Sequence, residues 1–240
     1  MNQQQHHKVT AFACLLATLA VAGCASTNVT TQERLVTEKL PKPSQILVYD
    51  FSASAADVPA DSTFASQSSA PAAPPTAEQA ELGRQLGTQI AEQLAAAIRE
   101  MGLPATQVSQ GAKPQINDIV FRGYLVSVDP GSKAKRMTIG FGSGGSELIT
   151  AIEGYQMTST GLRKLGSGTT GAKSSKGPGA SLGVASLVVT GNPVGLIVGG
   201  GLKVYGEASG SATIEGRAKA TAKEFADVLK QRFQKEGWIN

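Results

Sequence analysis

The chain has very little histidine or cysteine, and all of it lies near the N-terminus. Its two histidines are His6 and His7, and its two cysteines are Cys14 and Cys24. Beyond Cys24 the sequence therefore offers no imidazole and no thiol. This absence excludes Ser-His-Asp and Cys-His catalysis there, together with the usual zinc sites and an internal disulfide framework.

Aromatic residues and clustered charges are also scarce. Aromatic residues make up 5% of the chain, and the 22 basic residues exceed the 18 acidic ones only slightly. The basic residues are scattered rather than interleaved with aromatics, so no nucleic-acid partner is expected. The acidic residues, Asp50 and Glu153 among them, show no spacing that marks a catalytic pair, and we interpret them as solvated surface charges. We therefore expect a protein that is not an enzyme and that has no metal site or cofactor.

Residues 1–23 have the pattern of an export signal. A short polar start with Lys8 precedes the run AFACLLATLAVAG, which is shorter than a membrane span. The run ends in LAVAGC, which resembles the bacterial lipobox. The resemblance implies cleavage before Cys24, a diacylglyceryl group on its sulfur and usually a further acyl chain on the new amine, enough for stable anchoring. The alternatives are an ordinary signal peptide with a chance cysteine, or an apolar helix that stays in the membrane.

The residues after Cys24 suggest a destination. Ala25 and Ser26 are small, and no aspartate follows the cysteine. This is compatible with sorting to the outer membrane in lipoproteins of this kind. We expect a protein anchored by lipid to the bacterial outer membrane and facing the periplasm, with residues 24–43 as a polar tether.

Residues 44–240 are expected to form a single α+β domain. Short β-branched runs predict strands at 46–51, 119–129 and 146–157, the last two as an antiparallel pair, with a further short strand at 162–165. Apolar residues at helical spacing predict amphipathic helices over 76–101 and 214–235. The expected fold is a small, mainly antiparallel sheet covered by two helices. The Ser-, Ala- and Pro-rich residues 52–75 are expected to form a mobile loop.

The stretch GFGSGG, residues 140–145, matches the G-x-G-x-x-G pattern of dinucleotide sites. In such sites the glycines follow a buried strand and open a helix. Here a short basic segment precedes them and the strand-like ELITAIEG follows, so we interpret the glycines as a tight turn. Lys133, Lys135 and Arg136 lie next to this turn, and together they form a candidate anion site.

Residues 177–202 carry no charge and repeat the G-x-x-x-G spacing at Gly191, Gly195 and Gly199. This spacing lets helices approach closely. Asn192 and Pro193 would break a membrane-spanning helix, so we expect a glycine-rich apolar helical hairpin packed on the sheet or on a second subunit. Membrane contact or oligomeric insertion is the alternative.

The order of these features resembles the bacterial lipoprotein family catalogued as domain of unknown function 4410. The features are the lipobox, the strand ILVYDF, the helix, the run GYLVSVDPGSKAKRMTIGFGSGGSEL, a glycine-rich segment and a terminal helix ending in GW. The resemblance covers most of the chain beyond Cys24 and implies a location and a fold, without catalytic residues. We expect a non-enzymatic binding or assembly component of the cell envelope, with envelope proteins or a second copy as partners. The alternative is a module that binds an anionic phospholipid headgroup or glycan.

Overall fold

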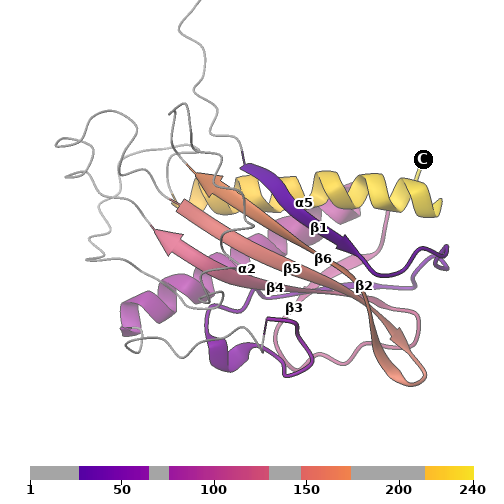
Figure 1. The fold of residues 1–240 in the computed structure, drawn as a ribbon, viewed down its shortest axis with the longest axis horizontal. Helices are drawn as coiled ribbons and strands as arrows, with labels where there is room; N and C mark the ends of the chain where they lie inside the picture. The colour runs from indigo at the N-terminus through magenta and orange to yellow at the C-terminus, as the bar shows by residue number, and fades with distance from the viewer. Residues whose placement is uncertain (1–26, 65–75, 130–146, 174–213) are drawn as a thin grey trace, which may run out of the picture.

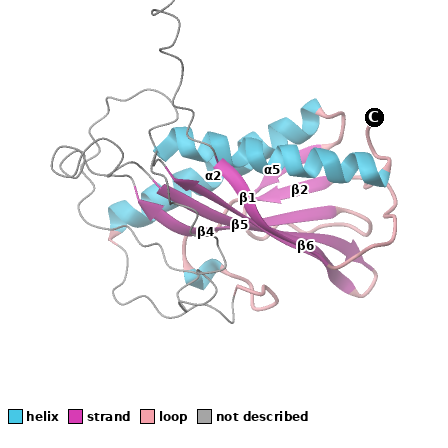
Figure 2. Cartoon of the chain, turned by 45° about the horizontal axis from the view of Figure 1, so that its top comes forward, coloured by secondary structure: helices cyan, strands magenta, loops and turns pink. Residues whose placement is uncertain are grey.

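The computed structural model describes residues 27–64, 76–129, 147–173 and 214–240 (Figure 1). Six strands form one sheet in the order β1-β6-β5-β4-β2-β3, and two long helices lie on one side of it (Figure 2). The strands are β1 (Thr27–Arg34), β2 (Ile46–Tyr49), β3 (Ala105–Val108), β4 (Ile119–Asp129), β5 (Glu147–Thr158) and β6 (Gly161–Lys173). The helices are α2 (Ala77–Glu100), α5 (Ile214–Glu236) and the short 3-10 helix η1 (Ala55–Asp57). The α+β class expected from the sequence is confirmed.

The sheet is mixed, so the expectation of a mainly antiparallel sheet is not confirmed. β1, β6, β5 and β4 pair antiparallel in that order, whereas β2 pairs in parallel with both β3 and β4. The parallel pair β2–β3 follows from the connection between them, because a helix such as α2 returns the chain to the end of the sheet from which it started.

The main core lies between the sheet and the two helices, on what we call the helix face of the sheet. The predicted stripe of α2 is confirmed, since Leu86, Ile90, Leu94 and Ile98 are each at most 1% exposed. They pack with residues of α5 and of the sheet in one apolar cluster. Phe51, two residues after the end of β2, packs in this core. Its backbone N–H donates to the Gly87 carbonyl of α2 at 3.2 Å, and its ring lies 6.1 Å from that of Phe225.

The opposite face of the sheet is covered by loops. Residues 52–64, which we call the strap, cross this strap face and place Val58 and Phe64 against Tyr124, Val126, Ile149 and Ala151. Ser52 begins the strap with two backbone hydrogen bonds to β4, from its N–H to Gly123 and from Leu125 to its carbonyl. This half of the predicted mobile loop is therefore docked, and residues 65–75 lie outside the described part of the chain.

The structure also changes the interpretation of the segment before β2. Residues 27–34 form β1, the edge strand beside β6, rather than a tether. Leu40 is held by the end of α5: its N–H donates to Glu236 Oε2 at 2.8 Å, and its carbonyl accepts from Trp238 Nε1 at 3.1 Å. From Thr27 onward this region is part of the folded body.

β6 is longer than predicted and continues through the glycine- and serine-rich residues to Lys173. Pairing on both sides, with β1 and β5, holds this weak strand former in extended conformation. The glycine-rich residues 177–202 lie outside the described part of the chain. Among the residues that the structure describes, no helix is both long enough and apolar enough to cross a membrane.

Candidate functional site: a groove between the two helices

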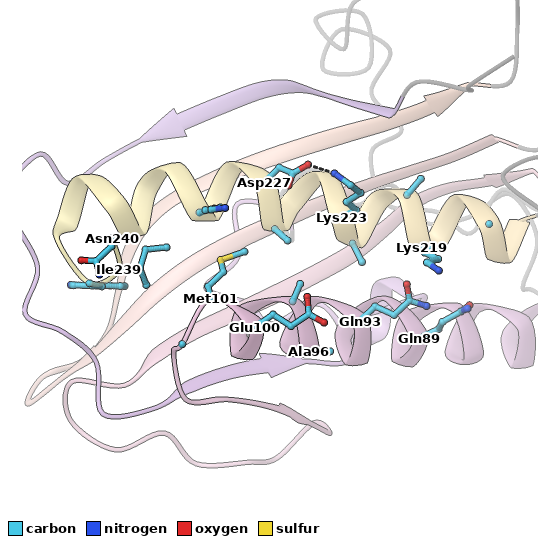
Figure 3. A pocket seen from close by; sticks show the side chains of 18 of the residues that line it. Gln89, Gln93, Ala96, Glu100, Met101, Lys219, Lys223, Asp227, Ile239 and Asn240 are labelled. Atoms are coloured by element: carbon cyan, nitrogen blue, oxygen red, sulfur yellow. Dashed lines mark hydrogen bonds and ion pairs between the residues drawn. The ribbon is translucent and has the colours of Figure 1, made fainter. Parts of the chain in front are cut away.

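An open groove runs between α2 and α5 on the outer side of the helix layer (Figure 3). The two helices lie side by side and run in the same direction, so that Gln89 and Gln93 of α2 lie across from Lys219 of α5. Met101, just after α2, lies near Ile239 and Asn240 at the chain end.

Small residues form the floor of the groove. Ala96 and Ala97 of α2 and Ala220, Ala222 and Ala226 of α5 line it. Alanine at these positions keeps the surface between the helices shallow and free of bulky side chains. A third helix can approach such a floor closely, because side-chain ridges of one helix pack into the grooves of its neighbours.

The walls of the groove are polar and slightly basic. Lys223 pairs with Asp227 at 2.6 Å, and this hydrogen bond raises the pKa of Lys223. Lys219 and Lys230 are exposed and form no ion pair with the described residues. Across from them α2 offers the amides Gln89 and Gln93, which can both donate and accept hydrogen bonds. Glu100 and Glu215 also line the groove, so its four lysines exceed its three carboxylates by one. The groove therefore slightly favours an acidic partner with hydrogen-bonding side chains.

The second notable cluster lies on the strap face, around Glu153 of β5. Its carboxylate is completely buried, and both of its oxygens accept hydrogen bonds. Oε2 accepts from the hydroxyls of Tyr124 at 2.9 Å and Tyr155 at 2.7 Å. Oε1 accepts from the Thr63 hydroxyl at 2.7 Å, the Thr63 N–H at 3.2 Å and Lys164 Nζ at 2.5 Å.

This network fixes the charge of Glu153. Burial alone would raise its pKa, but hydrogen bonds led by those from Lys164 and Thr63 outweigh burial and lower the pKa to about 2. Burial, reinforced by the nearby carboxylate, raises the pKa of Tyr155 and of Tyr124. The glutamate is thus ionised and its oxygens are occupied, while both tyrosines stay protonated as donors. The cluster acts as a clamp that fastens Thr63, and with it the strap, to the sheet.

A second contact holds the strap beside this clamp. Asp61 of the strap accepts from Arg122 Nη1 at 3.0 Å, and the Arg122 guanidinium lies 5.1 Å from the centre of the Tyr155 ring.

Because Glu153 is buried, interpreting it as a solvated surface charge was wrong. Its alternation with Ile149, Ala151 and Tyr155 along β5 places it on an otherwise apolar face, and this was the available sign of a buried ion pair.

The site residues predicted from the sequence lie outside the residues that the structure describes. They are Cys24, the basic trio Lys133, Lys135 and Arg136, and the glycines Gly191, Gly195 and Gly199. The residues of the groove were missed, because alanines beside a leucine- and isoleucine-rich stripe suggest only helix packing. Within the described ranges, no group of three or more acidic, histidine or cysteine side chains is placed to hold a metal ion.

The fold defines an α+β protein with two helices on one face of a six-stranded mixed sheet. The family model described as Domain of unknown function (DUF4410) matches residues 46–191, more than half of the chain, so the chain belongs to this family. The family assignment expected from the sequence is confirmed.

Comparison with curated proteins finds no match. Among solved structures, the chain is similar to the PelC dodecamer from Paraburkholderia phytofirmans, at 14% identity and a TM-score of 0.35, covering 69% of this chain and 98% of that one. A point variant of the same dodecamer matches at 12% identity and the same TM-score, covering 68% of this chain and 97% of that one. A likeness this distant says nothing about the function of the present chain.

Proposed function

We propose that this chain is a lipid-anchored component of the bacterial cell envelope that binds a protein partner in the groove between α2 and α5 and catalyses no reaction. In this proposal residues 1–23 are removed, Cys24 carries the lipid, and the body faces the periplasm from the outer membrane. The observation that carries the binding role is the groove itself, with its alanine floor and its exposed lysines Lys219 and Lys230.

The position of Cys24 supports a body held close to the bilayer. Only Ala25 and Ser26 separate it from Thr27, the first residue of β1. Three residues of fully extended chain span at most about 10 Å. A lipid on Cys24 would therefore hold the start of the sheet within about 10 Å of the membrane surface. The groove would then be within reach of partners in or near the same membrane.

The shape and charge of the groove favour an acidic helix as its occupant. On α5 the lining residues recur at Lys219, Lys223, Ala226 and Lys230, the spacing of one helix face. On α2 the lining runs from Gln89 to Glu100, roughly 17 Å of helix at about 1.5 Å per residue. This is the length of a contact that about three turns of a partner helix would make.

We extend the proposal to residues 177–202, which would form the apolar helical hairpin and pack through Gly191, Gly195 and Gly199 against the body or a second copy. The support is their lack of charge and their G-x-x-x-G spacing. Gly195→Leu is expected to disrupt self-association or folding, measured by sedimentation and circular dichroism. Unchanged sedimentation and folding in this variant would contradict the packing role.

Photocrosslinking in living cells tests the groove. The full chain would carry photoreactive benzoylphenylalanine in place of Gln93 or, separately, Lys219, with Lys113 as a control position beside the strap face. We expect both groove positions to capture the same protein, joined through an acidic helical segment that mass spectrometry identifies. The control position should not capture it.

A blocking variant makes this result specific to the groove. Ala96→Trp places a bulky ring on the floor and should lower the adduct yield at least fivefold, while the thermal unfolding of the chain stays close to that of the parent. An adduct that survives Ala96→Trp, or that forms equally from Lys113, would rule out the groove as the binding surface.

A further inference from the structure

A separate apolar cavity of about 340 Å³ lies beneath α5, between this helix and the β5–β6–β1 half of the sheet. Its deep walls are core side chains that include Phe121, Ile152 and Phe225. Nearer the opening it is lined by Val29, Leu165, Val228 and Leu229, apolar side chains that are only partly buried. Partly exposed apolar side chains on both walls of one cavity are typical of a ligand site.

Three of the residues that line the cavity from the sheet are glycines, Gly154, Gly166 and Gly168. Gly154 of β5 pairs directly with Gly166 of β6, and Ile152 pairs with Gly168. Since Ile152 belongs to the core of the helix face, alternation along the strands places all three glycines on that face. Two of these glycines are covered by close neighbours: a Cβ added at Gly154 would lie 3.2 Å from the Phe121 ring, and one added at Gly166 would lie 2.4 Å from the Glu33 carbonyl oxygen of β1.

The cavity is elongated. β1 and α5 run side by side in the same direction (Figure 1), as two contacts show. The Val29 N–H donates to Glu224 at 3.2 Å near one end, and Arg232 donates to the Val36 carbonyl at 3.4 Å near the other. The α5 wall from Phe225 to Phe233 is roughly 12 Å long at 1.5 Å per residue.

One end of the cavity is cationic. Arg34, Arg232 and Lys235 line it there, with Glu33 as an acidic neighbour. The Arg34 guanidinium is occupied by the carbonyls of Val36 and Thr37. Arg232 Nη2 is paired with Glu236 at 2.5 Å, but Arg232 Nη1 is buried and has no hydrogen-bond partner among the residues that the structure describes. A buried guanidinium donor without a partner is costly, and an anionic group is its natural complement.

We propose that this cavity binds a single-chain amphiphile, whose alkyl chain lies against Phe121, Ile152 and Phe225 and whose anionic headgroup accepts from Arg232. The volume falls within the range of about 300–1,000 Å³ that is usual for small-molecule sites. An apolar cavity of about half this size already takes up apolar molecules in preference to water. The chemistry fits a free fatty acid or a lysophospholipid. This site is independent of the groove and of lipid on Cys24.

Photolabelling of the full chain in phosphatidylcholine vesicles with a diazirine-bearing palmitate tests the proposal. We expect saturable labelling that mass spectrometry maps to residues 165–168 and 225–235. Stronger displacement by unlabelled palmitate identifies a fatty acid as the preferred ligand, and stronger displacement by lysophosphatidylglycerol identifies a lysolipid. Displacement by neither, or labelling spread evenly over the chain, would overturn the proposal.

Two variants of Val228 test whether the probe is bound in the cavity. Val228→Phe fills it and should reduce labelling at least fivefold, whereas Val228→Ala enlarges it and should leave labelling within twofold of the parent. Equal labelling of both variants would refute the cavity as the site. Circular dichroism confirms that each variant is folded.

The headgroup contact is tested by Arg232→Gln, with Lys230→Gln as the control, because Lys230 is exposed on α5 and does not line the cavity. Arg232→Gln should weaken labelling by the palmitate probe about tenfold and leave labelling by a diazirine-bearing hexadecanol unchanged. If Arg232 had only a structural role, the variant would reduce labelling by both probes, and that result would contradict the contact between Arg232 and the headgroup.

Discussion

On one face of the sheet, α2 and α5 bury a continuous apolar core, with their stripes packed on β2, β4 and β5. On the other face, the strap covers one smaller apolar cluster and is fastened by the buried carboxylate of Glu153. Both the groove between the helices and the cavity beneath α5 lie on the helix side, whereas the strap lies across part of the other face. The two proposed binding surfaces are therefore on the helix side, and the charged cluster on the strap side holds the strap to the sheet.

The largest effect on stability is expected from removing the clamp. Glu153→Ala leaves Lys164 and two tyrosine hydroxyls without their acceptor, so the free energy of unfolding should fall by about 3–5 kcal/mol. Urea unfolding followed by circular dichroism measures this. The matched control is Glu92→Ala on the exposed side of α2, which should stay within about 0.5 kcal/mol of the parent. A loss in Glu153→Ala no larger than in the control would show that the cluster is not a clamp.

The clamp should also make stability depend on pH. The pKa of Glu153 is lowered to about 2 in the folded chain, so the folded state holds its proton less tightly than the unfolded state does. The stabilisation is therefore complete above the unfolded pKa of about 4.5 and is lost as the pH falls from there toward 2. At about 1.4 kcal/mol per pKa unit this amounts to roughly 3 kcal/mol.

Urea unfolding at a series of pH values between 6 and 2 checks this dependence. The Glu153→Gln variant, which cannot titrate at this position, should be less stable at neutral pH and should lose less stability on acidification. Parallel curves for the variant and the parent would contradict the assignment of the pH dependence to Glu153.

On the helix face, a smaller effect is expected from crowding Phe51. A Cβ added at Gly123 would lie 2.2 Å from the Phe51 ring, so Gly123→Ala should destabilise the fold by about 1–3 kcal/mol. Gly171→Ala in β6 is the matched control, because its added Cβ meets nothing within 4 Å. Thermal unfolding of both variants should separate them clearly, and equal unfolding temperatures would argue against tight packing of Phe51.

The smallest effect is expected at the outer contact of the strap. The Asp61 side chain is 54% exposed, and its ion pair with Arg122 is screened by water. Asp61→Asn should therefore cost less than about 1 kcal/mol in urea unfolding. A loss of stability as large as that of Glu153→Ala would mean that the ion pair between Asp61 and Arg122 is the main contact that holds the strap.

The long, strongly patterned elements were predictable from the sequence. Helices α2 and α5 and the pair β4–β5 appear within a residue or two of the expected bounds, because their apolar residues repeat with the period of the element. The strands β1 and β3 were missed. TNVTTQER is polar and ATQV is short, and both become strands only by pairing with neighbours that are distant in sequence.

The sites were less predictable for a similar reason. The groove depends on which small residues of two helices meet, and the cavity depends on how α5 packs over β1, β5 and β6. Neither juxtaposition follows from the local sequence. The Glu153 cluster likewise joins residues from the strap, β4, β5 and β6. The lipobox, in contrast, is a contiguous pattern that the sequence alone displays.

The proposed function rests most directly on the chemical state of Cys24, because an anchor there would fix the sheet within about 10 Å of the bilayer. The decisive measurement is the mass of the N-terminal peptide of the protein isolated from membranes of its producing cells. The account predicts a chain that begins at Cys24 and carries two or three acyl chains, and predicts that Cys24→Ser abolishes the modification. A chain that retains residues 1–23, or one with an unmodified Cys24 thiol, would contradict it.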